Sequence, residues 1–279
     1  MKLWRVAFGF LMFGAVAAFA PLTRAQDVAA LTDLTLLAHL EGEKTPISSG
    51  LVWRLYADPT DGTPARFVID SHDPSPTLKL QPGAYIIHVT YGFSGTTRRV
   101  VLGAQPLRED VTISAGALTL AATVSDTPIP SDRVNFSIYV AVGTDPEGRL
   151  IVDNIKPNVV VRLPVGVYRI VSRYGDTNAI ASSDIKVEAG KLIDVTLRHR
   201  AATVTLKLVN KLGGDAYAGT TFSVLTPGGD TIRDLVGAFP SLILAEGEYI
   251  LIARNGGRIF TEEFKVRSGF DQDIEILDR

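Results

Sequence analysis

The sequence predicts an all-β protein that consists of three tandem antiparallel β-sandwich domains behind an N-terminal signal peptide. Two observations support this fold class. One short pattern, a leucine, two variable residues, a glycine, one further residue and a tyrosine, occurs three times in the 279 residues and leads each time into alternating apolar positions. Between the copies, short apolar runs alternate with clusters of glycine, proline and aspartate, and little of the chain keeps the 3.6-residue period of a helix.

The repeated pattern describes a tight turn that leads into a strand. Its copies begin at Leu80, Leu163 and Leu244. A glycine that can adopt positive φ suits the bend, and a tyrosine followed by aliphatic residues suits a half-buried strand. Because the tyrosine recurs with the fold, we expect it to pack in each domain with its hydroxyl bound to a nearby backbone group. The residues assigned this structural role are Gly83, Tyr85, Gly166, Tyr168, Gly247 and Tyr249.

An aromatic residue precedes each copy at a matching distance. Trp53 lies 30 residues before Gly83, Phe136 lies 30 residues before Gly166, and Phe222 lies 25 residues before the third glycine. We therefore expect these three aromatic side chains in the domain cores, with a shorter loop in the third domain. A period of about 80 residues favours tandem small domains over a solenoid of minimal repeats.

The first domain, residues 34–114, reads as short strands separated by turn clusters. Leu51, Trp53 and Leu55 occupy every second position, as the buried side of a strand does. The strands expected here are 34–40, 51–56, 65–70, 80–92, 96–102 and 109–113.

The second domain, residues 115–200, and the third, residues 201–279, repeat this order. The expected strands are 118–124, 134–140, 163–175, 180–187 and 192–197 in the second domain, and 202–209, 221–225, 244–256, 264–267 and 273–277 in the third. Asn255-Gly-Gly257 is the best hairpin signal, because a type I′ turn needs positive φ at both central positions. About seven short strands in a domain are typical of a β-sandwich.

Residues 1–25 have the features of a secretory signal peptide. Lys2 and Arg5 precede the apolar run 6–20, and small residues stand before a cleavage that we place after Ala25. The apolar run is shorter than the roughly 20 residues of a membrane-spanning helix, and residues 26–33 then form a short leader. The chain has no cysteine, so disulfides and lipid attachment at cysteine are excluded. We expect a periplasmic or secreted protein with no membrane span in the mature chain.

The charge balance disfavours nucleic acid and anionic membranes as partners. Loss of Lys2, Arg5 and Arg24 with the signal peptide takes the 28 basic residues to 25, against 30 acidic residues, for a net charge of −5. The short basic clusters Arg98-Arg99 and Arg198-His199-Arg200 are interpreted as solvated strand ends.

The Leu-x-x-Gly-x-Tyr strand, late in each all-β unit, resembles the carboxypeptidase-regulatory-like and CnaB-type modules of the Ig-like, prealbumin-like β-sandwich class. The resemblance covers residues 34–279 in three copies and implies spacers, stalks and binding platforms. Some CnaB modules form a lysine-to-asparagine or lysine-to-aspartate isopeptide bond, helped by a glutamate four residues after the motif tyrosine. Those positions are Val89, Ser172 and Ala253 here, so a bond between Lys207 and Asp273 is not expected.

No residue pattern points to a metal site. The four histidines, His39, His72, His88 and His199, lack zinc-binding spacing. His39 and His88 share the first domain, but two imidazoles without a third ligand make a poor site. Asp58, Asp61 and Asp145-Pro-Glu-Gly148 place acids at expected loop tips, but their spacing matches no calcium loop and is typical of turns.

Catalytic and cofactor motifs are equally lacking in the sequence. Gly92-Phe-Ser-Gly95 is not a Gly-x-Ser-x-Gly elbow, and no glycine-rich phosphate loop leads from a strand into a helix. We therefore expect a protein that is not an enzyme and binds no cofactor.

Tyr56 and Tyr139 are the candidate binding residues. Alternation along their strands turns them away from Trp53 and Phe136, so they are expected on a sandwich face or partly buried at a domain junction. The leading hypothesis is a non-catalytic, exported cell-envelope protein that acts as a multi-domain scaffold or protein-binding module, with an envelope protein as partner. The alternatives are glycan binding through the tyrosine faces or loop tips, and an accessory or inhibitor subunit of an envelope enzyme.

Overall fold

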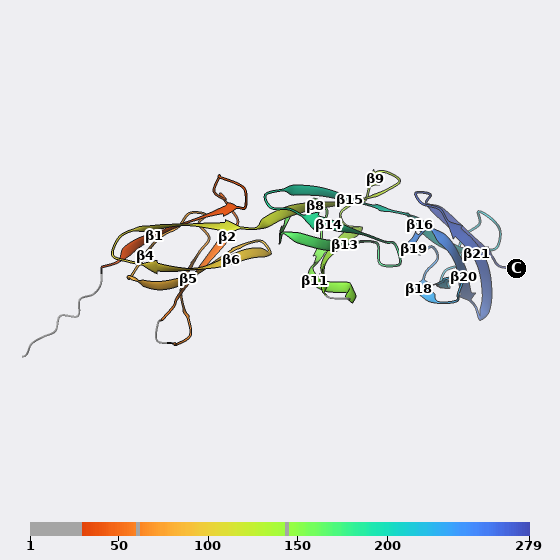
Figure 1. Cartoon of the computed structure of the whole chain (residues 1–279). Helices are drawn as coiled ribbons and strands as arrows, with labels where there is room; N and C mark the ends of the chain where they lie inside the picture. Colours follow the sequence, from red (N-terminus) through yellow and green to blue (C-terminus); the bar gives the residue numbers. More distant parts are fainter. Residues whose placement is uncertain (1–29, 60–61, 143–144) are drawn as a thin grey trace, which may run out of the picture.

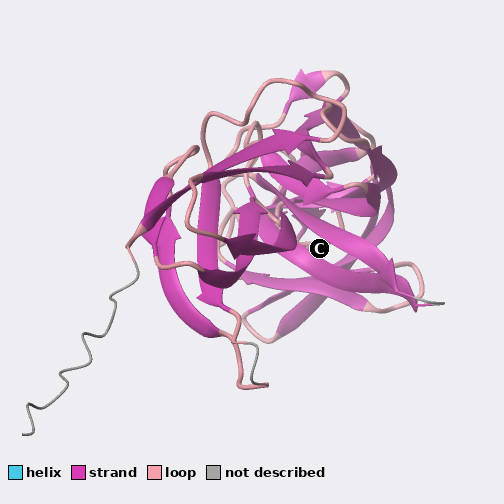
Figure 2. Cartoon of the chain, turned by 60° about the vertical axis from the view of Figure 1, so that its left-hand side comes forward, coloured by secondary structure: helices cyan, strands magenta, loops and turns pink. Residues whose placement is uncertain are grey.

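A computed structural model describes residues 30–59, 62–142 and 145–279. These residues form strands, turns and loops, with no helix among them (Figure 2), so the predicted all-β class is confirmed. The described part of the chain accordingly holds no helix that could span a membrane. The expected signal peptide, its cleavage site and leader residues 26–29 lie outside the described residues, and the first strand begins at Thr32.

The first domain packs two sheets, with the strand orders β4-β1-β7 and β3-β2-β5-β6. Its strands are β1 (Thr32–Leu40), β2 (Leu51–Ala57), β3 (Arg66–Ser71), β4 (Thr77–Leu80), β5 (Gly83–Tyr91), β6 (Ser94–Leu102) and β7 (Leu107–Ile113).

The second domain has the sheets β12-β8-β15, to which β9 adds by pairing with β8, and β11-β10-β13-β14. Its strands are β8 (Ala115–Val124), β9 (Thr127–Pro128), β10 (Val134–Val142), β11 (Asp145–Ile155), β12 (Val161–Pro164), β13 (Gly166–Tyr174), β14 (Ile180–Val187) and β15 (Leu192–His199).

The third domain has the sheets β19-β16-β22 and β18-β17-β20-β21. Its strands are β16 (Ala201–Val209), β17 (Thr221–Leu225), β18 (Thr231–Val236), β19 (Ser241–Ala245), β20 (Gly247–Asn255), β21 (Arg258–Val266) and β22 (Gln272–Leu277).

Each smaller sheet contains one parallel pair, which differs from the antiparallel pairing predicted. β7 runs parallel to β1, β15 to β8, and β22 to β16. The last strand of each domain thus lies beside the first and points the same way. Alternation of buried and exposed residues records which face of a strand is buried, but not the direction of its neighbour, so the sequence pattern could not reveal this.

Each domain has its own core between its two sheets. Trp53, Phe136 and Phe222 are completely buried, one in each core. In β2, the buried residues Leu51, Trp53 and Leu55 alternate with half-buried ones, as the spacing predicts. The hydrophobic effect therefore fixes which face of each strand turns inward.

The three domains follow one another along the molecule in sequence order (Figure 1). A single residue separates the last strand of one domain from the first strand of the next. This connector is Ser114 at the first junction and Arg200 at the second. Such short connectors bring the ends of neighbouring domains into contact.

One predicted turn and one predicted boundary are wrong. Residues 145–148 open the strand β11 rather than forming a loop tip. The hairpin strand predicted at 264–267 starts at Arg258, because β21 pairs with β20 from the Asn255-Gly-Gly257 turn onward.

Candidate functional site

The motif tyrosines hold the bend that precedes each motif strand. Each hydroxyl donates a hydrogen bond to the backbone carbonyl four residues earlier. The O···O distances are 2.8 Å from Tyr85 to Gln81, 3.0 Å from Tyr168 to Pro164 and 2.7 Å from Tyr249 to Ala245. Burial raises the pKa of all three phenols, so they stay protonated donors. Their role in this geometry is architectural.

The motif glycines do not adopt positive φ, which corrects the expectation from the sequence. Gly83, Gly166 and Gly247 instead open the strands β5, β13 and β20. A Cβ on Gly166 would lie 3.6 Å from the Tyr168 ring, and the other two would lie 3.7–3.8 Å from theirs. The glycines therefore leave room for the tyrosine ring that folds back over them.

Tyr56 and Tyr139 lie at matching positions on the outer faces of the larger sheets. Both are half-buried. The Tyr56 ring meets the ring of its cross-strand neighbour Phe67 edge to face, with centroids 5.8 Å apart, and Phe67 is 52% exposed. Tyr139 lies opposite the aliphatic Leu150 instead. The first domain thus presents an aromatic pair, and the second a tyrosine beside an aliphatic side chain.

The other candidate ligands do not converge. His39 bonds to Asp110 at 3.2 Å, whereas His88 bonds to Thr97 in the other sheet. The hydrogen bond from His39 is the main cause that lowers the pKa of Asp110. Within 30–59, 62–142 and 145–279, no three histidine, aspartate or glutamate side chains gather as a metal site would require.

Of the acids at the expected loop tips, Asp58 has a described side-chain partner. Asp58 pairs with Arg99 across the sheet. Asp61 lies outside the described residues, and Asp145 begins β11. The calcium-site hypothesis therefore gains no geometry from the described residues.

The Arg198-His199-Arg200 cluster contains a buried histidine, contrary to its interpretation as a solvated strand end. His199 is 3% exposed, and its Nε2 lies 2.8 Å from the hydroxyl of Ser172, which is also buried. The Tyr174 ring meets the imidazole edge to face. The signal for this was strand alternation, which turns His199 inward while its arginine neighbours turn outward. Because both members are buried, the serine–histidine pair has no access to a substrate.

Acid is expected to destabilise the second domain through His199. Burial lowers the pKa of this imidazole below its ordinary 6.5. The second domain therefore keeps its full stability above pH 6.5. Between pH 6.5 and the folded-state pKa only the unfolded chain binds the proton, so the free energy of unfolding falls as the pH falls. Below the folded-state pKa it levels off. The slope is at most about 1.4 kcal/mol per pH unit. Hydrogen exchange of the second domain, read at a series of pH values, measures it.

The matched control for this prediction comes from the first domain. Val89 and Ile113 occupy there the strand positions that Ser172 and His199 occupy in the second domain. The double variant Ser172→Val/His199→Ile should lose the acid-dependent slope. Equal slopes in the variant and the wild type would refute the assignment.

Lys207 and Asp273 are brought together by the fold, but as an ion pair. Their side chains meet at 2.5 Å between β16 and β22. The hydrogen bond to Asp273 is the main cause that raises the pKa of Lys207, which keeps the amine protonated and therefore not nucleophilic. This agrees with an uncross-linked third domain.

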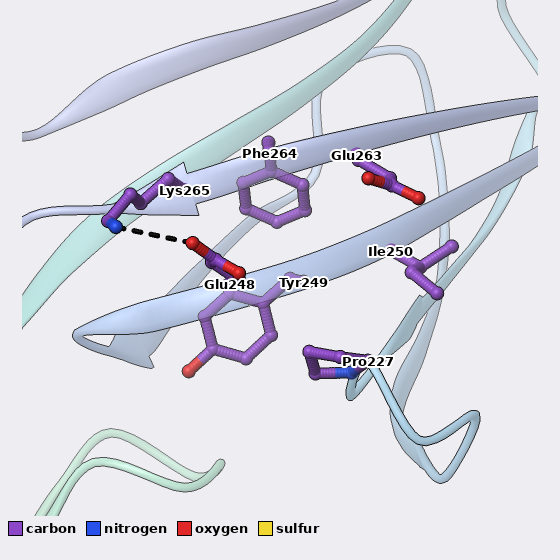
Figure 3. A pocket seen from close by; sticks show the side chains of 7 residues that line it. All are labelled: Pro227, Glu248, Tyr249, Ile250, Glu263, Phe264 and Lys265. Atoms are coloured by element: carbon purple, nitrogen blue, oxygen red, sulfur yellow. Dashed lines mark hydrogen bonds and ion pairs between the residues drawn. The ribbon is translucent and has the colours of Figure 1, made fainter.

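A shallow pocket of about 360 Å³ lies on the third domain beside its motif tyrosine (Figure 3). The rings of Tyr249 and Phe264 stack at 5.5 Å, and Lys265 pairs with Glu248 at 3.2 Å. Glu263 adds a second carboxylate to the lining. Both rings are buried in the core of the third domain, so the lining offers a ligand charged groups but no nucleophile paired with a base.

The connectors are bonded to the following domains in the same way at both junctions. The Ser114 carbonyl accepts a hydrogen bond from Val165 N at 3.3 Å, and the Arg200 carbonyl accepts one from Glu246 N at 2.8 Å. Both donors stand just before a motif glycine. The first domain has Pro82 at this position, which offers no N–H. The repeated motif therefore also serves the attachment of one domain to the preceding one.

A second backbone bond is repeated one residue further along. The Ala115 carbonyl accepts from Gly190 N, and the Ala201 carbonyl accepts from Gly269 N, both at 2.9 Å. In each case the donor lies in the turn before the last strand of the following domain. Donor and acceptor belong to the same domain in both cases, so these bonds secure the start of its first strand next to the connector.

A hairpin tip of the first domain and one of the second domain also rest on the domain that follows. Phe93 N donates to the Arg162 carbonyl at 3.0 Å, and the Thr177 hydroxyl donates to the Ile243 carbonyl at the corresponding place of the second junction. The Arg162 guanidinium lies 4.7 Å from the centroid of the Tyr91 ring, and Ile243 enters the core of the second domain. Polar and apolar contacts therefore lock both junctions.

Comparison with known proteins identifies one family model that matches part of the chain. Residues 203–278, which form most of the third domain, match the Rhizobiales growth-associated tandem repeat domain. No curated protein sequence matches the chain.

Several solved structures match the chain at low identity. The Bacillus anthracis TIE protein matches at 14% identity and a TM-score of 0.27, over 90% of this chain and 50% of its own, so the chain spans half the length of that protein. A streptococcal ancillary pilin matches at 12% identity and a TM-score of 0.33, over 89% of this chain and 99% of its own. The major pilin subunit BcpA of Bacillus cereus matches at 11% identity and a TM-score of 0.25, over 89% of this chain and 100% of its own.

Proposed function

We propose that this chain is a non-catalytic protein of the cell envelope whose three domains form a scaffold that presents protein-binding surfaces at fixed spacing. The observation that supports this is the repeated junction. Single-residue connectors, and hairpin tips bonded at equivalent positions of the following domain, hold each domain against the next. A tether needs no such contacts, whereas a scaffold depends on them, because an interface of fixed geometry limits the relative motion of domains.

The proposal includes export through the N-terminal signal peptide to the periplasm or the cell exterior. The match of the third domain to a growth-associated repeat favours a partner among the proteins that act during growth of the envelope. The domains are proposed to belong to the prealbumin-like sandwiches that include carboxypeptidase-regulatory-like and CnaB-type modules.

The scaffold is tested by capture of partners from cells. A tagged wild-type chain is expected to recover a defined envelope protein after cross-linking, and a variant with flexible glycine–serine insertions at both connectors is expected to recover less. Equal recovery by the two chains would refute the scaffold, and so would a defined catalytic turnover by the pure protein. Recovery of an envelope enzyme whose rate the chain alters would favour the accessory-subunit alternative.

Glycan binding is the second candidate, and the pair of Tyr56 with the exposed Phe67 favours it, because aromatic faces stack on sugar rings. Retention on a polysaccharide that disappears in Tyr56→Ala, with Tyr139→Ala as the parallel variant in the second domain, would support this candidate. No retention on any polysaccharide would remove it.

A further inference from the structure

The first junction contains an apolar pocket. It has a volume of about 430 Å³ and lies between the hairpin tip of the first domain and the β11–β12 segment of the second domain. Phe93, Val159 and Val160 line it and are 42–51% exposed. Ligand sites are typically apolar clefts of about this size, and they occur preferentially between domains. We refer to it as the junction pocket.

The second junction has an ion pair at the equivalent position. Asp176 follows Gly175 in the hairpin of the second domain, as Phe93 follows Gly92 in the first. Asp176 meets Arg233 on β18 of the third domain at 2.8 Å. The residue that corresponds to Arg233 on β11 is Val152, since the two occupy the same cross-strand position. Both members of the bridge are thus apolar at the first junction.

The polar groups at the rim of the junction pocket have an excess of positive charge. Lys156 is exposed and has no acidic partner among the described residues, and Arg162 contacts the Tyr91 ring but no carboxylate there. The one acid in the lining, Asp153, accepts a hydrogen bond from Ser137, which is the main cause that lowers its pKa. The pocket therefore suits an apolar group accompanied by negative charge.

We propose that the junction pocket binds an extended segment of a partner protein, which inserts an aromatic or branched apolar side chain beside Phe93 and Val160 and places aspartate or glutamate carboxylates near Lys156 and Arg162. This assignment rests on the proposed function only in taking the partner to be a protein. It identifies the kind of segment that the scaffold holds and locates it between two domains, where contact with both depends on the fixed junction.

The test uses two fluorescent hexapeptides and the full chain. Both peptides carry a central Phe-Val, flanked in one by aspartates and glutamates and in the other by lysines. Fluorescence anisotropy should show saturable binding of the acidic peptide, at least about tenfold tighter than the basic one, and Lys156→Gln should weaken it by about two- to fivefold, as expected for an exposed ion pair. Phe93→Asp/Val152→Arg, which rebuilds the bridge of the second junction, should weaken it by about tenfold or more.

Phe239→Ser provides the matched control. Phe239 is an aromatic side chain that is 63% exposed on the third domain and does not line the junction pocket, so its loss should leave the affinity unchanged. The proposal is overturned if the acidic peptide does not saturate, if both peptides bind equally, or if Phe239→Ser weakens binding as much as the double variant. If the peptide test fails while the wild-type chain still captures its partner in cells, only the junction-pocket proposal is rejected. If the variant with flexible connectors captures the partner as well as the wild type does, the scaffold proposal is rejected.

Discussion

Alanine at Gly92 or Gly175 is expected to loosen a domain junction, whereas alanine at Gly256 is not. The three glycines share one hairpin position and have φ values of 64°, 73° and 56°. Alanine in this left-handed region costs about 1–2 kcal/mol at every one of them. Only at Gly92 and Gly175 would the added methyl group also collide with another domain. A Cβ would lie 2.6 Å from Arg162 Cβ at Gly92 and 2.9 Å from Ile243 Cδ1 at Gly175, but no atom lies within 4 Å of it at Gly256.

Spin labels can measure this loosening, because the chain contains no cysteine and accepts labels only where one is introduced. Val101→Cys and Val167→Cys place labels on exposed positions of the first and second domains. The distance distribution between them should broaden in Gly92→Ala and stay narrow in Gly256→Ala. The pair Val167→Cys and Ile259→Cys reports the second junction and Gly175→Ala in the same way. Equal widths in the Gly92 and Gly256 variants would contradict the rigid junction on which the scaffold depends.

Alanine at Trp53 should destabilise the first domain by about 3–5 kcal/mol, the usual cost of removing a fully buried large aromatic side chain. Phenylalanine at the same position should cost within about 1 kcal/mol. The indole Nε1–H is buried without a hydrogen-bond partner among the described residues, and an unsatisfied donor of this kind costs about 1–3 kcal/mol, so its removal offsets much of the lost packing. The second and third domains already hold phenylalanine there.

Hydrogen exchange read separately for each domain measures these costs and avoids assigning one unfolding energy to a three-domain chain. Phe136→Ala is the matched control and should destabilise the second domain by a similar amount while the first keeps its protection. If Trp53→Phe destabilises as strongly as Trp53→Ala, the equivalence of the three aromatic positions is wrong.

The all-β class and the buried positions followed from local patterns. Alternation along residues 51–56 placed Trp53 in a core, and the recurrence of the tyrosine pointed to a packing role before any contact was known. Such signals are readable because the side-chain period of a strand sets which residues share a face. The same periodicity could not report the parallel partner of β1 or the extended φ of Gly83.

The sequence by itself determined that one β-unit was repeated three times, which residues each unit buries, and that no catalytic motif accompanies them. Only the tertiary structure decided how the units are joined and what their joints expose. The junction contacts link residues far apart in sequence, such as Phe93 with Arg162 and Asp176 with Arg233, and no local pattern encodes such pairs. Whether a joint carries an ion pair or two apolar side chains depends on residues from different domains, and only folding brings them together.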